Sequence, residues 1–171
     1  MAIQLRPWKA EDRAAIAALC DAVDRRFLSD RLPQPYTEAD ADSWLCYVRQ
    51  HDEKEGLFRA ILVDGEVVGM ISAEQKQDVY RKDAELGYSL ATNRWSQGVM
   101  TEAVRQFCPL AFAALGLVRM TGMVYEENIA SRKVLEKNGF VLEGTLRKAV
   151  IKAGRGQNLC IYGKLNPEAE G

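Results

Sequence analysis

Hydrophobic residues recur along this chain at two spacings, and the two spacings predict different elements. Steps of three and four residues are typical of an amphipathic helix, whereas strict alternation is typical of a half-buried strand. Asp64-Gly65 separates two alternating segments, and this dipeptide is a strong signal for a two-residue hairpin turn. The elements predicted in the first half are a strand at residues 3–8, helices at 10–27 and 37–50, and strands at 57–63 and 66–73.

The second half of the chain continues with strands and helices in alternation. Gly116 and Gly139 directly follow the two predicted helices, as glycines at helix ends commonly do. The order is βααβββαβαββ, and the central strand–helix–strand unit requires a right-handed parallel crossover between antiparallel hairpins. We therefore expect a mixed sheet covered by helices. The elements predicted here are strands at 84–90, 118–125, 140–151 and 157–165, and helices at 98–115 and 128–138.

Composition limits the class of protein. With 171 residues, 47% hydrophobic and 27% charged, the chain is expected to form one compact, soluble domain over residues 1–171. Its 23 basic and 24 acidic residues nearly cancel, which disfavours nucleic acid as a partner. Neither a signal sequence nor an apolar run of membrane-spanning length is present, so no membrane association and a cytoplasmic location are expected.

Cysteine and histidine usage argues against a metal site and against disulfides. The four cysteines are scattered and form no CxxC pair, a pattern that favours reduced thiols. His51 is the only histidine, and it lies in a run of charged residues typical of a solvated loop. A hydrolase of the serine–histidine–aspartate type would depend on this residue, so that class is disfavoured.

Gly98 marks the most informative segment of the sequence, because a strand and loop give way there to a strongly amphipathic helix. A helix start exposes unpaired N–H groups and the positive end of the helix dipole, which together bind phosphate. A glycine allows a diphosphate to approach the backbone without a Cβ atom in the way. Neither the P-loop nor the Rossmann glycine pattern is present.

Four motifs follow one another in a recognisable order. They lie at residues 85–88, 95–103, 128–140 and 143–147. In this order they resemble the GNAT superfamily of N-acetyltransferases, and within it the branch of ribosomal-protein N-terminal alanine acetyltransferases. The resemblance implies the GNAT fold of class α/β (α+β). This is a mixed, mostly antiparallel sheet of six to seven strands with a parallel central pair and helices on both faces.

The resemblance also implies acetyl-CoA as co-substrate, attacked directly by an amine. The pantetheine arm would lie between the strands at 84–90 and 118–125 where they separate, and the 95–103 loop would hold the diphosphate. Arg94 is a candidate phosphate contact or a solvated loop residue. The residues expected to contact the coenzyme are Tyr88, Ser89, Leu90, Arg94, Gln97, Gly98, Val99, Met100, Thr101, Asn128 and Ser131.

Two residues are the candidates for proton transfer. Glu85 is the candidate general base, acting through a water, and Ser131 is the candidate acid for the departing thiolate. Asn128 contacts the coenzyme or simply caps its helix, and Tyr88 and Tyr125 are alternative phenol donors. The sequence departs from the family at Leu135, where many members have a tyrosine acid.

The amine acceptor is the least determined partner. Residues 21–42 carry six acids against three arginines, which favours either an acidic rim for a cationic amine or two solvated helix faces. Tyr36 and Trp44 are candidates for an acceptor pocket or a homodimer contact. The expected function is acetylation of a protein N-terminal α-amine. The alternatives are a small amine (a polyamine, an aminoglycoside or an amino acid) and a non-catalytic acyl-CoA-binding module.

Overall fold

One seven-stranded sheet organises the structure, a computed structural model that describes residues 1–169. The strand order is β1-β2-β3-β4-β5-β7-β6, and only the β4–β5 pair is parallel. This confirms the predicted mixed sheet with a parallel central pair. The strands are β1 Ile3–Arg6, β2 Gly56–Val63, β3 Glu66–Gln75, β4 Asp83–Leu90, β5 Arg119–Tyr125, β6 Val141–Lys152 and β7 Arg155–Leu165.

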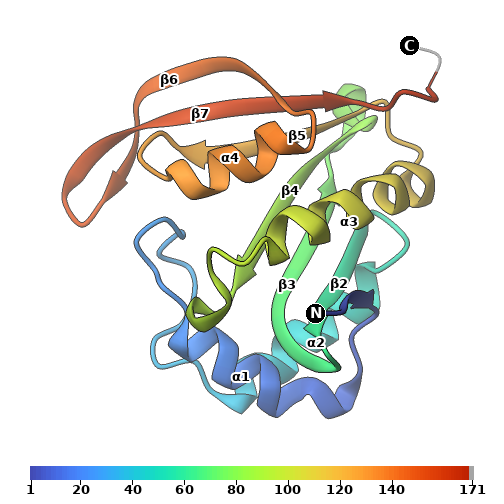
Figure 1. The fold of residues 1–171 in the computed structure, drawn as a ribbon, viewed down its shortest axis with the longest axis vertical. Helices are drawn as coiled ribbons and strands as arrows, with labels where there is room; N and C mark the ends of the chain where they lie inside the picture. The colour runs from blue at the N-terminus through green and yellow to red at the C-terminus, as the bar shows by residue number, and fades with distance from the viewer. Residues whose placement is uncertain (170–171) are drawn as a thin grey trace.

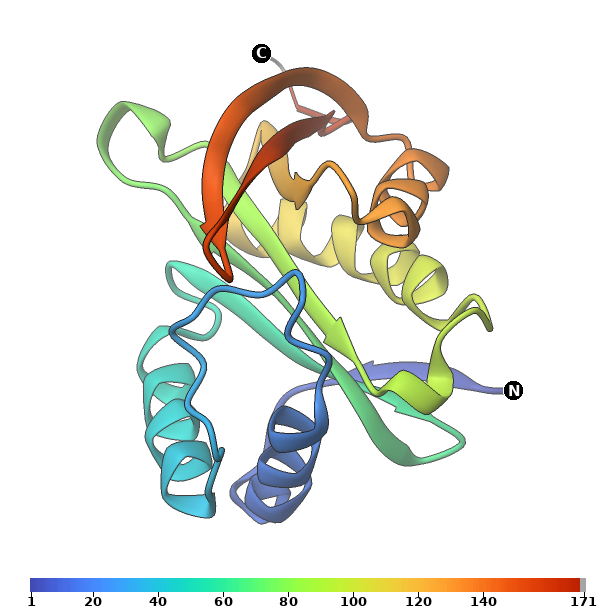
Figure 2. The ribbon, with the colours of Figure 1, turned by 90° about the vertical axis from the view of Figure 1, so that its left-hand side faces the viewer.

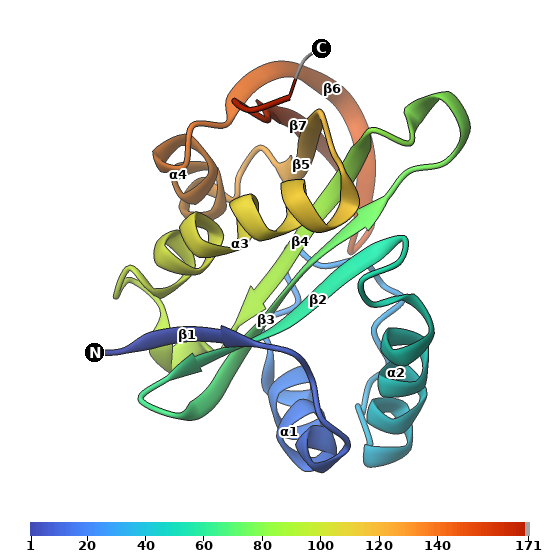
Figure 3. The same ribbon diagram turned by 90° about the vertical axis from the view of Figure 1, so that its right-hand side faces the viewer.

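Helices cover both faces of this sheet (Figures 1 and 3). Successive side chains of β3 point to opposite faces of the sheet and so reach different helices. Met70 packs against the cluster formed by the first two helices, whereas its neighbour Ile71 lies in the main core. Helices α1 and α2 thus lie on one face, and α3 and α4 on the other. Their bounds are α1 Arg13–Ala22, α2 Glu38–His51, α3 Val99–Leu115 and α4 Ile129–Lys137.

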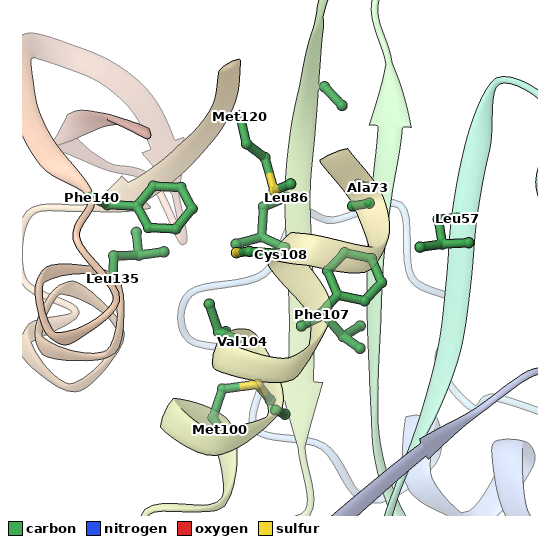
Figure 4. Packing of buried hydrophobic residues seen from close by; sticks show 14 of the residues in the cluster. Leu57, Ala73, Leu86, Met100, Val104, Phe107, Cys108, Met120, Leu135 and Phe140 are labelled. Atoms are coloured by element: carbon green, nitrogen blue, oxygen red, sulfur yellow. The ribbon is translucent and has the colours of Figure 1, made fainter. Parts of the chain in front are cut away.

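The main core lies between the sheet and α3, with α4 closing one side (Figure 4). Phe107 is fully buried at the centre of α3, as the predicted helical spacing requires. Leu135 of α4 is 1% exposed, and a Cβ atom added to Gly122 of β5 would lie 2.9 Å from its Cδ1 atom. The close approach of α4 to β5 therefore depends on a glycine in the strand and a leucine in the helix.

The first helix is shorter than the predicted range of 10–27. It begins after a 3₁₀ turn, η1 at Ala10–Asp12, and α1 ends at Ala22. The Arg25 guanidinium explains the early end, since it donates hydrogen bonds to the carbonyls of Cys20, Leu32 and Pro33. These bonds satisfy a carbonyl of the last helical turn and hold the following loop in a fixed path.

The loop from residue 23 to 37 crosses toward the tip of the β6–β7 hairpin (Figure 2). Lys152 donates to Asp30 over 2.6 Å, and the ring of Phe27 packs edge-on against Tyr125 at a centroid distance of 5.8 Å. The Tyr125 hydroxyl donates to the Leu28 carbonyl. Contacts with β5, β6 and α1 thus determine the position of the α1–α2 loop.

Tyr36 and Trp44 belong to the second hydrophobic cluster, which joins α1 and α2. Tyr36 is 8% exposed, and Trp44 packs edge-on against Trp8 with ring centroids 5.2 Å apart. Trp8 lies beyond the end of β1 at Arg6, so the predicted strand at 3–8 is two residues too long. The two aromatic residues are therefore packing residues. No helix within residues 1–169 is both long and apolar enough to cross a bilayer.

Leu135→Ala tests the importance of the α4–β5 contact. Removal of a buried leucine side chain is expected to lower the free energy of unfolding by about 2–5 kcal/mol, because the cavity beside Gly122 has no side chain to fill it. Urea denaturation measures this. Leu110→Ala in α3 is the matched control, since Leu110 is 48% exposed, and it should change the value by less than about 0.5 kcal/mol. Equal effects would contradict the packing argument.

Candidate active site

The two central strands separate partway along their length (Figure 1). β4 and β5 pair only between Asp83–Leu86 and Arg119–Gly122. Beyond this point β4 continues to pair with β3 as far as Leu90, and β5 continues to pair with β7 as far as Tyr125. The facing edges of the two strands are therefore unpaired after Leu86 and Gly122, which is the separation that the resemblance implied.

Two residues of β4 direct their main-chain amides to this unpaired edge. The Ala91 amide donates to the Val68 carbonyl, so Ala91 faces β3. Because hydrogen-bonding direction alternates along a strand, Tyr88 and Leu90 face the opposite way, toward β5. The indole Nε1 of Trp95 donates to the Leu90 carbonyl over 3.1 Å. The N–H groups of Tyr88 and Leu90 and the Tyr88 carbonyl thus form an edge available to an extended ligand.

The loop after β4 leads directly to the start of α3. Gly98 is the N-cap residue, with φ of 77° and no side-chain cap, and an added Cβ atom would meet nothing within 4 Å. Positive φ requires a residue such as glycine here, and the space beside it is open. Val99 and Met100 are buried, so their side chains belong to the core while their N–H groups begin the helix. The first turn of α3 is an uncapped helix start of the kind that binds anions.

The remaining loop residues have partners within the protein. The Gln97 side chain donates to the Asn93 carbonyl, and Arg94 forms an ion pair with Glu66 at 3.2 Å. The Thr101 carbonyl accepts a hydrogen bond from the Asn138 side chain, which ties α3 to the end of α4. The Arg94 side chain would have to leave Glu66 to reach a phosphate.

Tyr88 and Ser131 meet across the separation. The phenol oxygen of Tyr88 lies 2.6 Å from Oγ of Ser131, on the helix α3–α4 side of the sheet. Asn128 is the N-cap of α4 and accepts from the Ser131 N–H over 3.2 Å, as the capping alternative anticipated. Burial raises the pKa of Tyr88 to about 12, although its hydrogen bond with Ser131 acts in the opposite direction. The phenol is therefore protonated throughout the physiological range.

Glu85 lies on the other face of the sheet, the face that α1 and α2 cover. It is exposed and lies opposite Glu74 in the β3–β4 ladder, and its carboxylate has no hydrogen bond or ion pair within the described residues. The Tyr47 hydroxyl donates to Glu74 over 2.6 Å, and this hydrogen bond is the main reason that the pKa of Tyr47 rises to about 12. The two candidate proton-transfer residues, Glu85 and Ser131, thus approach the strand separation from opposite faces.

Glu74 and the Tyr88–Ser131 contact are the parts of the site that the sequence analysis did not identify. The alternation of apolar residues in β3 and β4 is the signal that could have placed Glu74 opposite Glu85, because aligning the buried positions of the two strands fixes their register. Trp95 is the first residue of the 95–103 motif, and the hydrogen bond from its indole N–H to the Leu90 carbonyl gives it a structural role. Within residues 1–169, no three or more histidine, cysteine or acidic side chains are grouped as metal ligands would be.

Of the two alternatives for residues 21–42, an acidic rim or two solvated helix faces, the structure favours the second, because the acids of this segment have partners within the protein. Each of its six acids has a partner within the protein: Asp21 accepts from the Tyr36 N–H, Asp40 caps α2, and the others pair with arginine or lysine. Those ion pairs are Asp24 with Arg26, Asp30 with Lys152, and Glu38 and Asp42 with Arg13. Within residues 1–169, the carboxylate beside the strand separation that has no hydrogen bond or ion pair is instead that of Glu85.

Comparison with known proteins agrees with this geometry. The profile of the acetyltransferase (GNAT) domain matches residues 3–141. The Bacillus subtilis (strain 168) protein named "Putative ribosomal N-acetyltransferase YdaF" is 35% identical over 136 residues, which are 80% of this chain and 72% of that protein. The spermidine N(1)-acetyltransferase of Escherichia coli (strain K12) is 25% identical over 163 residues, 94% of this chain and 86% of that one.

A solved structure shares the whole architecture. The ribosomal L7/L12 alpha-N-protein acetyltransferase RimL, in complex with coenzyme A, superposes with a TM-score of 0.84 at 21% identity. The superposition covers 96% of this chain and 94% of that one. On the extent of the domain match and the identity to its relatives, the chain belongs to the GNAT acetyltransferase family and is an N-acetyltransferase.

Proposed function

We propose that the protein transfers the acetyl group of acetyl-CoA to the α-amino group of a protein N-terminus. The observation that carries the proposal is the unpaired edge of β4, which begins beyond Leu86 and leads to the uncapped start of α3 at Gly98. An extended pantetheine arm needs main-chain partners, and a diphosphate needs N–H donors. The chain offers both in sequence along one path. A non-catalytic role is not proposed, because the family is one of enzymes.

Main-chain groups supply most of the coenzyme contacts in this proposal. The Tyr88 and Leu90 amides pair with the pantetheine arm, and the N–H groups from Val99 to Thr101 hold the diphosphate. The buried side chains of Val99 and Met100 anchor the start of α3 to the core, so the N–H groups are held in place before the ligand arrives. An amide at the unpaired edge also serves as oxyanion donor for the thioester carbonyl.

Catalysis requires formation of a C–N bond and cleavage of a C–S bond, with one proton leaving nitrogen and one reaching sulfur. Glu85 takes the first proton through a water on the α1–α2 face, and Ser131 gives the second on the α3–α4 face. The opposite positions of the two residues suit this division, because the amine enters and the thiol leaves on different sides of the acyl carbon.

An α-amine suits a site whose base is exposed. Its pKa of about 7.7–8 leaves part of it neutral at cellular pH, whereas a lysine near 10.4 is almost wholly charged. An exposed carboxylate acting through water is a modest base, and Glu85 is such a group. The names of two similar proteins, both referring to ribosomal N-acetylation, support the same acceptor class.

A polyamine is the second candidate acceptor. Glu74 and Glu85 lie directly opposite each other on neighbouring strands, and two adjacent carboxylates attract a cation with several amino groups. The similarity to a spermidine acetyltransferase points the same way at lower identity. Within residues 1–169 the Glu74 carboxylate accepts only from the Tyr47 hydroxyl and forms no ion pair.

Gly98→Val tests the coenzyme site. A side chain at this position would enter the open space beside the helix start and is expected to weaken acetyl-CoA binding at least about tenfold, measured as Kd by calorimetry. Gly154→Val is the matched control, because Gly154 also has positive φ and open space but lies in the β6–β7 turn. Unchanged affinity in Gly98→Val, or equal loss in both variants, would contradict the proposed phosphate contact.

Glu85→Gln tests the base. We expect kcat with an N-terminal peptide to fall about 100-fold, while Kd for acetyl-CoA stays within about twofold, because Glu85 acts only on the amine. Rates like those of the unmodified protein between about pH 6 and 9 would remove Glu85 from the mechanism. Glu74→Gln distinguishes the acceptors: it should raise KM for a polyamine and leave that for a peptide unchanged.

An acceptor panel tests the substrate class. Release of free CoA thiol is measured with N-terminal peptides, spermidine, an aminoglycoside and free amino acids, each at the same concentration. We expect kcat/KM for the best peptide to exceed that for the best small amine at least about tenfold. The reverse order would exclude the protein N-terminus as the preferred acceptor.

A further inference from the structure

The Tyr88–Ser131 contact is the closest pairing of two hydroxyl groups at the strand separation. Its oxygen–oxygen distance of 2.6 Å is at the short end of the range for O–H···O hydrogen bonds. Ser131 is the third residue of α4, and no other partner of its Oγ atom is found among residues 1–169. The orientation of the serine hydroxyl therefore depends on the phenol.

The chemistry of the two groups determines which one donates. A phenol is a much stronger acid than an aliphatic alcohol, so the Tyr88 hydroxyl is the better donor and Ser131 Oγ the better acceptor. The phenol oxygen also lies 3.4 Å from the Ser131 carbonyl, a second acceptor on the same residue. When Ser131 accepts from Tyr88, its own proton is free to point elsewhere, and donation to the oxygen strengthens its capacity to donate.

The other phenols around α4 have different partners. The Tyr162 hydroxyl, which reaches α4 from β7, accepts from Arg132 and donates to Glu136. The Tyr125 hydroxyl donates to Leu28 in the α1–α2 loop. Leu135 is buried against Gly122 and has no polar atom to offer. Tyr88 is therefore the phenol that serves Ser131.

Tyr88 also stands at the right place along the strand. It is two residues beyond Leu86, where pairing of β4 with β5 ends, and its amide faces the unpaired edge. A ligand paired with that amide has its reactive end close to the point where the strands meet. One residue can thus contact the ligand through its main chain and hold the acid through its side chain.

We propose that Tyr88 is the positioning residue for Ser131: by donating to Oγ, it turns the serine proton toward the sulfur of the departing thiol. This inference rests on the proposed function. As the C–S bond breaks, Ser131 gives its proton to the thiolate and is reprotonated from water, and Glu85 releases to water the proton that it took from the amine, so that one proton leaves nitrogen and one reaches sulfur. Tyr88 keeps its own proton throughout and therefore serves only to orient the serine.

A double-mutant cycle tests this assignment with acetyl-CoA and the best acceptor of the unmodified protein. Ser131→Ala is expected to lower kcat about 100-fold, and Tyr88→Phe about tenfold with KM for acetyl-CoA within about twofold. The double variant should match Ser131→Ala within about twofold, since Tyr88 has no role once the hydroxyl is absent. Tyr162→Phe, which removes a phenol hydroxyl that contacts α4 away from Ser131, is the control and should retain kcat within about twofold.

Three outcomes would overturn the proposal. The first is a loss of kcat of about 1000-fold in the double variant, which would mean that the two residues act independently. The second is a Tyr88→Phe variant with unchanged kcat. The third is a Tyr162→Phe variant as slow as Tyr88→Phe. The last would show that the effect comes from the packing of α4. Failure of the proposed function is seen separately in the unmodified protein, which would then release thiol faster with a small amine than with any N-terminal peptide, or release none at all.

Discussion

The short β4–β5 ladder is the constraint on which the rest of the site depends. Its closed end is fixed by Asp83, a buried carboxylate that accepts from Thr121 of β5 over 2.8 Å and pairs with Lys76 at 2.6 Å. Because Asp83 is buried and has partners on both β5 and the segment after β3, it holds the two strands together at this end. At the other end β4 pairs with β3 and β5 pairs with β7, so the edges of β4 and β5 that face each other stay unpaired.

The candidate proton-transfer groups on the two faces of the sheet lie in different environments. On the α3–α4 face the hydroxyls of Tyr88 and Ser131 are partly buried and hold each other, and burial keeps the phenol neutral. On the α1–α2 face the Glu85 side chain is exposed and has no partner among the described residues. In the proposed function, a thioester held at the strand separation would therefore meet partly buried hydroxyls on one face and an exposed carboxylate on the other.

Local signals in the sequence predicted most of the fold, and contacts between distant residues explain what they missed. Asp64-Gly65, the cap at Thr37 and the glycine at 98 each determine structure within a few residues, and the structure has a turn or helix start at each. The end of α1 depends on Arg25 reaching back to Cys20, which no helix-stop signal announces. Tyr88 and Ser131 are 43 residues apart, and their contact requires the parallel register of β4 and β5.

Charge in the sequence was a poorer guide to the acceptor than charge in the structure. The acids of residues 21–42 left open a surface for cations, but four of them pair with arginine or lysine, and Asp21 and Asp40 accept hydrogen bonds from Tyr36 and Thr37. A carboxylate already paired with an arginine or lysine contributes little field to a passing amine. Glu74 and Glu85, which lie opposite each other beside the strand separation, form no ion pair within residues 1–169. In the proposed function, acceptor preference would therefore follow from which acids have no ion-pair partner, and not from how many acids the segment contains.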